Sequence, residues 1–260
     1  MMQTNPKISI VTVVLNDSER FHHTASNIAE LSYENIEYIV IDGGSSDETL
    51  NVIDGFKDGI DVYLSEHDEG LYHAMNKGIE LATGEWIIFM NAGDKFENNK
   101  ILNTIFKAGS YEDFDILYSD VKVSYTGFQT YQSSGDMTEI EKGMQFCHQS
   151  ALIKLTYHKR RHYNIQNKMC ADFEFFYNAA NQNVSFLKLN QTIANVTSLG
   201  ISDRNREAVY YSWWSIIGFN DIKLNFFYIH RIFIAIVKRI IKFLLPKKII
   251  YFIIRKINNI

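Results

Sequence analysis

The chain of 260 residues contains little cysteine and little proline. Its two cysteines, Cys147 and Cys170, are too few for a disulfide framework and favour a reducing compartment. Its two prolines, Pro6 and Pro246, provide no proline-rich linker between domains. No basic-then-apolar leader opens the sequence, and the apolar run at residues 8–15 is too short to cross a bilayer. These absences favour a cytoplasmic globular protein without a membrane span.

Several signature motifs of nucleotide-binding and hydrolytic enzymes are also missing. No GxGxxG follows the first apolar run, and neither GxxxxGK[ST] nor GxSxG occurs. The eight histidines form neither an HExxH motif nor a Cys/His zinc pattern. The sequence therefore lacks a dinucleotide fingerprint, a phosphate loop, a hydrolase elbow and a zinc-binding pattern.

Charge is distributed unevenly along the chain. All 30 acidic residues lie in residues 1–221, whereas residues 222–260 contain nine Lys and Arg and no acidic residue. An acidic body argues against nucleic acid as a partner. A basic, apolar tail argues for an anionic membrane surface as the partner of residues 222–260.

The tail has the pattern of helices that lie in a membrane interface. On a helical wheel its cationic positions share about half of the circle; they are Lys223, His230, Arg231, Lys238, Arg239 and Lys242. Ile234 and Ile241 interrupt that face. We expect one or two interfacial helices, broken at Pro246. The alternative is a terminal helix packed on the body or on a second subunit, as in a homodimer.

Alternating strands and helices are predicted for the first half of the chain. Short apolar, β-branched runs predict strands at residues 8–15, 36–41, 61–65 and 86–90, and the intervening segments predict helices at 21–31, 47–56 and 71–82. Strands at 116–118 and 121–125, a turn at Thr126-Gly127, and helices at 100–107 and 172–180 are expected further on. Such βαβ units predict an α/β fold with a mostly parallel central sheet.

Polar residues follow each predicted strand of the first half. They are Asn16, Asp42, Glu66, Asp68, Asn91 and Asp94. Because the carboxyl ends of parallel strands lie along one edge, these side chains can converge on one crevice. We expect Asp94 to hold a divalent metal that binds a nucleotide diphosphate. The alternative is an ordinary Asx or capping turn after the strand.

Four stretches together resemble glycosyltransferase family 2, whose members have the GT-A fold. They are ISIVTVVLN, IVIDGGSSDET, SEHDEGLYHAMNKGIELATGEWIIFMNAGD and CADFEFF, and the resemblance covers roughly residues 7–200. The third stretch resembles the branch that builds bacterial capsules, O-antigens and exopolysaccharides. The resemblance implies a GT-A-type mixed, mostly parallel sheet flanked by helices, followed here by a C-terminal amphipathic helical extension.

The resemblance also implies roles for individual residues. Asp172 would be the general base, and Asp94 would bind Mn²⁺ or Mg²⁺. Residues placed near the donor nucleotide are Asn16, Asp42, Gly43, Asp68, Asn76, Lys77 and Asn91, and those near the acceptor or donor sugar are His148 and Gln149. From the residues alone, Asp172 could instead be a helix N-cap and His148 a satisfied core histidine.

One departure from the family pattern concerns the metal. The usual Asp-x-Asp motif is replaced by Asn91-Ala92-Gly93-Asp94, which leaves one carboxylate. A hard divalent cation accepts one protein carboxylate when phosphates and waters supply the other ligands, so we expect weak metal affinity without nucleotide. A metal-independent variant is the alternative.

The sequence therefore predicts an inverting hexosyltransferase that uses a nucleotide-sugar donor and a lipid-linked saccharide acceptor at the cytoplasmic face of the membrane. Residues 1–205 would form the transferase domain, with a nucleotide half at 1–95 and an acceptor half at 96–205, and residues 206–260 the extension. The alternatives are a nucleotidyltransferase, whose triphosphate loop is missing, and a catalytically inactive donor-binding or scaffolding subunit.

Overall fold

The structure is a computed structural model that describes residues 5–125, 127–197, 205–245 and 249. Thr126 of the expected turn and Pro246 of the expected helix break lie outside the described residues. The chain divides into two compact units. The first contains Met1–Ile140 and Met144–Thr197, and the second contains Glu141–Gly143 and Ser198–Ile260.

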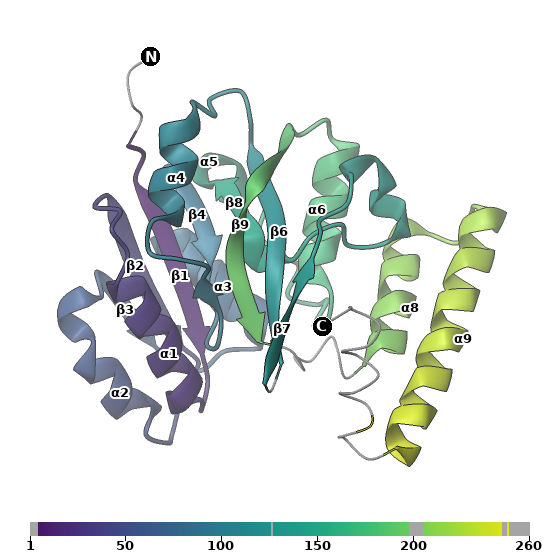
Figure 1. The fold of residues 1–260 in the computed structure, drawn as a ribbon, viewed down its shortest axis with the longest axis horizontal. Helices are drawn as coiled ribbons and strands as arrows, with labels where there is room; N and C mark the ends of the chain where they lie inside the picture. Colours follow the sequence, from purple (N-terminus) through teal and green to yellow (C-terminus); the bar gives the residue numbers. More distant parts are fainter. Residues whose placement is uncertain (1–4, 126, 198–204, 246–248, 250–260) are drawn as a thin grey trace. The chain divides into compact units, whose positions relative to one another are not determined.

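A nine-stranded sheet forms the centre of the first unit (Figure 1). Its strands are β1 (Ile8–Val14), β2 (Ile36–Asp42), β3 (Val62–Ser65), β4 (Trp86–Phe89), β5 (Lys95–Phe96), β6 (Ile116–Tyr125), β7 (Phe128–Gln132), β8 (Ala151–Lys154) and β9 (Phe186–Thr197). Their order is β3-β2-β1-β4-β8-β6-β9-β5, and β7 pairs with β6.

The strands run in mixed, mostly parallel directions. β1 pairs in parallel with β2 and β4, and β2 with β3, whereas β8 is antiparallel to both of its neighbours, β4 and β6. The register from Ile8↔Ile36 to Val14↔Asp42 brings the carboxyl ends of β1 and β2 to one edge. The predicted α/β fold with a mixed, mostly parallel sheet is confirmed.

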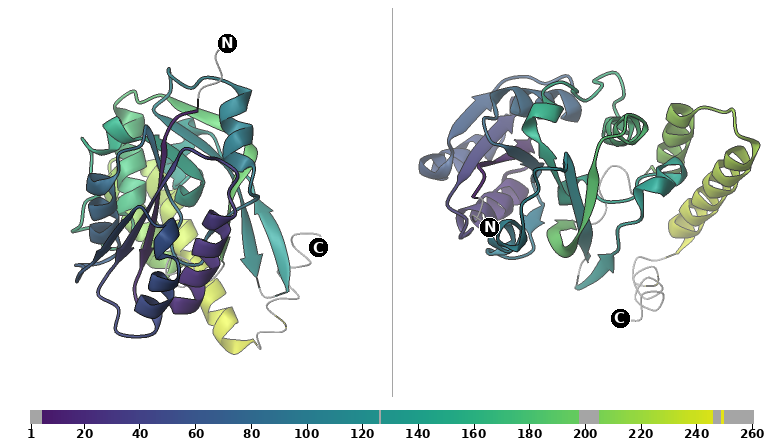
Figure 2. Two further views of the ribbon diagram at one scale, coloured as in Figure 1. Left: turned by 90° about the vertical axis from the view of Figure 1, so that its left-hand side faces the viewer. Right: turned by 90° about the horizontal axis from the view of Figure 1, so that it is seen from above.

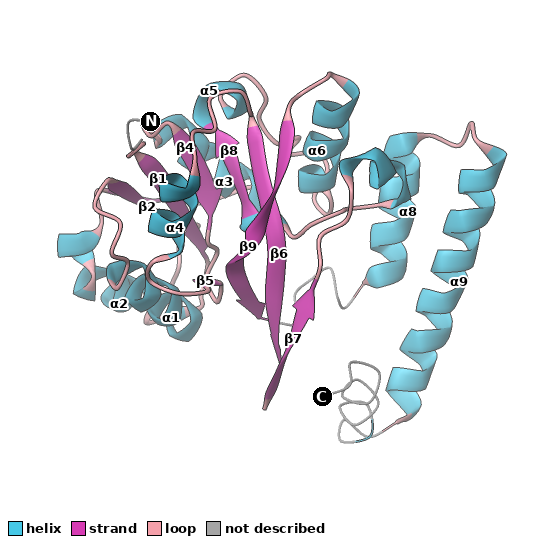
Figure 3. Ribbon diagram, turned by 45° about the horizontal axis from the view of Figure 1, so that its top comes forward, coloured by secondary structure: helices cyan, strands magenta, loops and turns pink. Residues whose placement is uncertain are grey.

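Helices cover both faces of the sheet (Figures 2 and 3). They are α1 (Ser18–Ala29), α2 (Thr49–Gly55), α3 (Leu71–Leu81), α4 (Ile101–Ala108), α5 (Leu155–His158) and α6 (Ala171–Asn181). Side chains of α1, α2 and α4 share one buried core with Trp86 and Ile88 of β4, and those of α3, α5 and α6 share the other with Ile87 and Phe89. Because β4 is buried on both faces, its sequence is apolar throughout.

The structure differs from the sequence prediction mainly in the second half of the first unit. The two strands expected at 116–118 and 121–125 are one strand, β6, whose register with β9 shifts around Asp120. The polar residues Ser119 and Asp120 interrupt the apolar run at this irregularity, which is why the sequence predicted two strands in place of one. The sequence pattern does not predict β8, which is short, or β9, in which polar residues interrupt the apolar alternation.

The second unit contains α8 (Arg206–Ile217) and α9 (Ile222–Leu244). Trp214 of α8 stacks on the buried ring of Tyr228 of α9, with ring centroids 6.2 Å apart, and its Nε1 donates to Asn225 Oδ1 over 2.8 Å. The side chain of Asp221 caps α9 by accepting from the backbone N–H groups of Lys223 and Leu224. Aromatic stacking and the hydrogen bond from Trp214 to Asn225 therefore hold α8 and α9 together, and Asp221 stabilises the start of α9.

Candidate active site

The carboxyl ends of β1 and β2 carry a tightly hydrogen-bonded loop. Asp42 is fully buried, and its carboxylate accepts from the backbone N–H groups of Gly44 and Ser45 and from Ser65 Oγ. Asn16 adopts a φ of 49°, a conformation that Asn tolerates, and its Oδ1 accepts from Ser46 N over 2.8 Å. Asp42 and Asn16 thus order the loop that follows β2, where a donor nucleotide was expected.

The loop after β3 brings acidic side chains to the same edge. Lys77 Nζ lies 2.6 Å from Asp68 Oδ1 and 2.8 Å from Glu66 Oε1. A Cβ atom at Gly43 would lie 3.1 Å from Asp68 Oδ2, so glycine allows the loop after β2 to approach Asp68 closely. The expected donor residues Gly43, Asp68 and Lys77 therefore lie together.

Asn76 is occupied by a backbone segment. Its Nδ2 donates to Tyr163 O and its Oδ1 accepts from Tyr163 N, each over 2.9 Å. These two bonds fasten α3 to the segment before α6. In this arrangement Asn76 supports the wall of the site, and its side-chain amide is already hydrogen-bonded at both ends.

The turn after β4 presents Asp94. Gly93 adopts a φ of 103°, which suits glycine, and Asp94 N donates to Asn91 O. Thr24 of α1 holds this turn, because its hydroxyl donates to Asp94 O over 2.7 Å and accepts from Gly93 N over 2.9 Å. Thr197 Oγ1 donates to Gly93 O from the end of β9.

The environment of Asp94 suits a cation. Burial raises the pKa of Asp94 to about 7, although a hydrogen bond from Gln149 and the charge of Arg20 act in the opposite direction. Asn91 Oδ1 is also buried and has no hydrogen-bond partner among the described residues. A divalent cation would stabilise the ionised form of Asp94, and the unpaired amide oxygen of Asn91 would coordinate it. These residues therefore fit a metal ion.

The metal-binding potential of the protein alone is nevertheless small. The described part of the chain contains no group of three or more His, Cys, Asp or Glu side chains that could hold a metal ion. With one carboxylate, a bound ion would need oxygen ligands from a substrate diphosphate and water.

Asp172 lies in the first turn of α6 and does not cap it. The N-cap residue is Cys170, and Asp172 Oδ1 accepts a hydrogen bond from the Tyr72 hydroxyl over 2.8 Å. Asp172 Oδ2 lies 4.0 Å from His148 Nδ1. The carboxylate is therefore positioned by α3 and by the short helix η3 (His148–Ser150).

His148 and Gln149 link the two acidic sites. Gln149 Nε2 donates to Asp94 Oδ2 over 3.0 Å, while His148 Nδ1 faces Asp172. Cys147 Sγ donates to Gln149 Oε1, which fixes the orientation of the amide. Burial lowers the pKa of His148, and the nearby charge of Asp172 only partly opposes this shift. His148 Nε2 has no hydrogen-bond partner in the described structure. A satisfied core histidine would not leave this nitrogen unpaired.

Two residues with clear contacts in this site were missed by the sequence analysis. Tyr72 fits the apolar periodicity of α3 and would be assigned to the core, yet its hydroxyl bonds to Asp172. Thr24 lies in the middle of α1 and carries no local signal for its contact with the turn after β4. Tyr72 lies in the long stretch that resembles the family, and that position could have marked it as a site residue. The contact of Thr24 depends on tertiary packing, so no sequence signal could have marked it.

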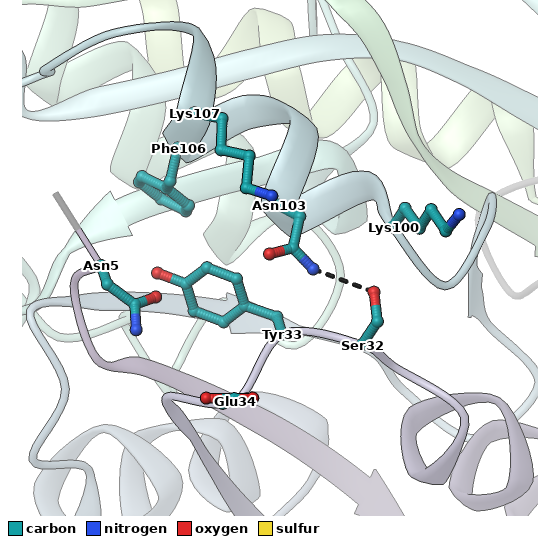
Figure 4. A pocket seen from close by; sticks show the side chains of 8 residues that line it. All are labelled: Asn5, Ser32, Tyr33, Glu34, Lys100, Asn103, Phe106 and Lys107. Carbon is teal, nitrogen blue, oxygen red and sulfur yellow. Dashed lines mark hydrogen bonds between the residues drawn. The ribbon is translucent and has the colours of Figure 1, made fainter. Parts of the chain in front are cut away.

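Two cavities lie near the ends of the strands. One of about 650 Å³ adjoins the turn after β4, and its lining includes Asn16, Arg20, Gly93, Lys95 and Thr197. The other, of about 560 Å³, lies where the chain enters β1 and β2; its lining includes Tyr33 and Asn103, whose Nδ2 donates to Ser32 Oγ (Figure 4). Of the predicted site residues, Asn16 lines the first cavity and none lines the second.

The mixed sheet positions two carboxylates, Asp94 and Asp172, that Gln149 and His148 connect. The model of the family described as "Glycosyl transferase family 2" matches residues 9–179. The chain belongs to this family, which confirms the resemblance seen in the sequence.

Curated relatives are named as glycosyltransferases. The chain is 30% identical over 175 residues to a PGL/p-HBAD biosynthesis glycosyltransferase of Mycobacterium tuberculosis, covering 65% of this chain and 68% of the relative. It is 26% identical over 171 residues to glycosyltransferase GlyG of Streptococcus pneumoniae, covering 65% of this chain and 52% of GlyG. The protein is thus a glycosyltransferase by family and by its relatives.

Solved structures share the fold. Residues 1–349 of S. aureus TarS in complex with UDP-GlcNAc match with a TM-score of 0.62 and 16% identity, over 80% of this chain and 65% of that chain. A mannosyltransferase from Pyrobaculum calidifontis, in complex with GDP-Man and Mn²⁺, matches with a TM-score of 0.60 and 14% identity, over 78% and 60%. The chain spans less than two thirds of these structures, and the likeness establishes the GT-A-type fold.

Proposed function

We propose that this protein transfers a hexose from a UDP-sugar donor to an acceptor hydroxyl with inversion of the anomeric carbon. The observation that carries the proposal is the connection made by η3, whose Gln149 bonds Asp94 and whose His148 faces Asp172. Inverting transfer requires one group that supports the departing diphosphate and another that accepts the acceptor proton. Asp94 and Asp172, which η3 contacts through Gln149 and His148, would supply these groups.

On the leaving-group side, Asp94 and Asn91 Oδ1 would hold Mn²⁺ or Mg²⁺ together with the donor diphosphate. When bound, such an ion would offset the negative charge that develops on the diphosphate as it departs. Gln149 restrains the Asp94 carboxylate through its 3.0 Å hydrogen bond, and Thr24 restrains the backbone of the turn. The chain therefore contributes a fixed acidic group at this position.

On the acceptor side, Asp172 would act as the general base. The acceptor oxygen forms a bond to the anomeric carbon, the bond from that carbon to the diphosphate oxygen breaks, and the acceptor proton passes to Asp172. General-base catalysis of this kind contributes roughly 10²–10⁴-fold to a rate. Tyr72 positions the carboxylate by donating to Oδ1, which leaves Oδ2 for the acceptor.

The donor nucleotide would bind at the carboxyl edge of β1 to β3. Asp42 and Asn16 would shape the loop around the uridine, Gly43 and Asp68 would line its wall, and Lys77 would lie close to the diphosphate. The ion pairs that Lys77 makes with Asp68 and Glu66 support this proposal, because an arriving diphosphate can exchange for one of them. Asn76 would act through the Tyr163 backbone that it holds.

The acceptor would be a lipid-linked saccharide used in the synthesis of a bacterial surface polysaccharide, such as a capsule or an O-antigen. The basic, apolar tail at residues 222–260 supports an acceptor that is reached at a membrane surface. Such an acceptor requires work at a membrane surface, for which we propose the cytoplasmic face and contact through residues 222–260. Residues 1–205 would carry out the transfer, and residues 206–260 would provide the attachment.

Release of UDP from candidate UDP-sugars, with and without a saccharide acceptor and with and without EDTA, tests the activity. Asp172→Asn should lower kcat at least 100-fold while leaving UDP affinity unchanged, because it removes the proton acceptor and keeps the shape. Asp136→Asn, at an exposed carboxylate outside the site, is the matched control. An Asp172→Asn enzyme with normal kcat would refute the base assignment.

A catalytically inactive donor-binding or scaffolding subunit is the second candidate. The observation in its favour is the single carboxylate after β4, where two are usual in the family. Tight UDP binding by calorimetry without acceptor-stimulated UDP release, over a panel of donors and acceptors, would select this candidate.

A further inference from the structure

The outer face of α9 carries a continuous apolar stripe. The exposed members are Ile222, Phe226, Ile229, Phe233, Ile236, Val237, Ile240, Ile241 and Leu244. Their spacing follows the helical repeat, so they line one side of α9 over about 33 Å at 1.5 Å per residue. Ile222, Phe226, Phe233 and Leu244 each expose between 64% and 70% of their surface.

The opposite side of α9 is already used inside the second unit. Tyr228 and Ala235 are buried, and Tyr228 stacks on Trp214 of α8 while its hydroxyl donates to Glu141 O over 2.9 Å. The apolar stripe is therefore a second hydrophobic face, separate from the one that packs the helical hairpin. A surface patch of this extent on a single helix marks an interaction site.

Cationic side chains border the stripe. Lys223, His230 and Lys238 are exposed along one flank of it. Arg231 lies over the rings of Tyr210 and Phe227, at 5.5 Å and 5.1 Å from their centroids, and Arg239 pairs with Glu207. Acidic residues are absent from the sequence of α9 and from everything after it.

We infer that this stripe docks α9 parallel to the surface of an anionic lipid bilayer. Apolar side chains would enter the acyl boundary while the flanking cations meet lipid phosphates, which is the arrangement of an interfacial helix. The described helices include none long and apolar enough to cross a membrane, and α9 carries its charges along its whole length. The charge pattern favours an anionic surface over an apolar protein groove, which would need acidic partners placed at intervals along the helix.

This inference deepens the proposed function, since it specifies how the chain would reach a lipid-linked acceptor. The arrangement also accounts for the two isoleucines that interrupted the basic face on the helical wheel. Ile241 belongs to the exposed stripe, while Ile234 is half-buried.

Co-sedimentation of the full chain with vesicles of phosphatidylglycerol and phosphatidylcholine tests the inference. The double variant Phe226→Asp/Phe233→Asp should lower the partition coefficient about 100-fold, since burial of each phenyl ring contributes roughly tenfold or more. The matched control is Leu50→Asp/Tyr131→Asp, which changes two exposed apolar residues of the first unit and should bind as the parent does. Circular dichroism should show equal helix content in all variants.

The charge component is tested separately. Lys223→Glu/Lys238→Glu should weaken binding to the anionic vesicles at least tenfold, and salt should weaken the binding of the parent chain in the same direction. Both effects should shrink on vesicles of phosphatidylcholine alone. Equal binding of the parent and Phe226→Asp/Phe233→Asp chains to anionic vesicles would overturn the inference.

Self-association is the competing use of the stripe. Light scattering of the lipid-free chain should give a monomer mass for the parent and for the Phe226→Asp/Phe233→Asp variant. A dimer that this variant converts to a monomer would overturn the lipid assignment in favour of a second copy. UDP release with a soluble acceptor, measured without vesicles, should be unaffected by the variant, so failure of membrane docking is distinguishable from failure of the transfer reaction.

Discussion

Glu37 ties together the amino ends of the strands that lead to the site. It is only 5% exposed, and its carboxylate accepts from Ser9 Oγ over 2.6 Å, from Thr83 N over 2.7 Å and from Lys7 Nζ over 2.8 Å. Thr83 Oγ1 also donates to it. Burial acts to raise the pKa of Glu37, but these hydrogen bonds outweigh it and lower the pKa from 4.5 to about 2.

Replacement of this carboxylate should therefore destabilise the fold in a pH-dependent way. The folded pKa lies below the unfolded one, so the contribution is fully present above about pH 4.5 and is lost as pH falls towards 2. At about 1.4 kcal/mol per pKa unit, it amounts to roughly 3 kcal/mol at pH 7 and to about half of that at pH 3. Glu37→Gln should lower the free energy of unfolding by these amounts.

Urea unfolding of the parent chain and of Glu37→Gln at both pH values measures the effect, with hydrogen exchange of the β1 and β2 amides as a local probe. Glu34→Gln, at an exposed neighbouring position, is the control and should change the free energy of unfolding by less than about 0.5 kcal/mol. An equal loss at pH 7 and pH 3 would show that Glu37 acts through packing, and that its charge contributes nothing.

Three further substitutions address the site. Asp94→Asn should weaken Mn²⁺-dependent binding of UDP at least tenfold in calorimetry and leave metal-free binding unchanged; equal loss in both would exclude a metal role. Tyr72→Phe should lower kcat about tenfold at constant donor KM, because the hydroxyl positions Asp172; a rise in KM alone would contradict this. Thr24→Val should cost about 1–2 kcal/mol of unfolding free energy and weaken metal-dependent UDP binding, and Thr24→Ser should restore both; normal UDP binding by the Val variant would refute its hold on the turn.

The sheet of the first unit was predictable because its strands are buried on both faces. β1, β2 and β4 are rich in apolar residues, and a polar residue stands at or just after the end of each strand: Asn16, Asp42 and Asn91. Parallel pairing brings those residues to one edge whatever the details of packing. The strands β8 and β9 were missed because polar side chains and short length obscure their period.

The connections between the acidic groups were not predictable. Thr24 reaches the turn after β4 across 70 residues of sequence, and Tyr72 reaches Asp172 across 100. Neither contact leaves a periodic signal in the sequence, because each joins elements that are far apart along the chain. Asn76 was expected near the donor nucleotide, but in the folded chain its side-chain amide forms two hydrogen bonds with the Tyr163 backbone.

The sequence alone therefore predicted several strands of the first half and where they end. It also showed that one carboxylate follows β4 and that the tail is basic and apolar. The meeting of Asp94 and Asp172 through Gln149 and His148 required the folded chain, as did the separation of α9 into a packed face and an exposed stripe. The physical reason is that burial periodicity and turn propensity act between near neighbours. Hydrogen bonds between distant elements, and the exposure of one helix face over another, arise only when those elements pack.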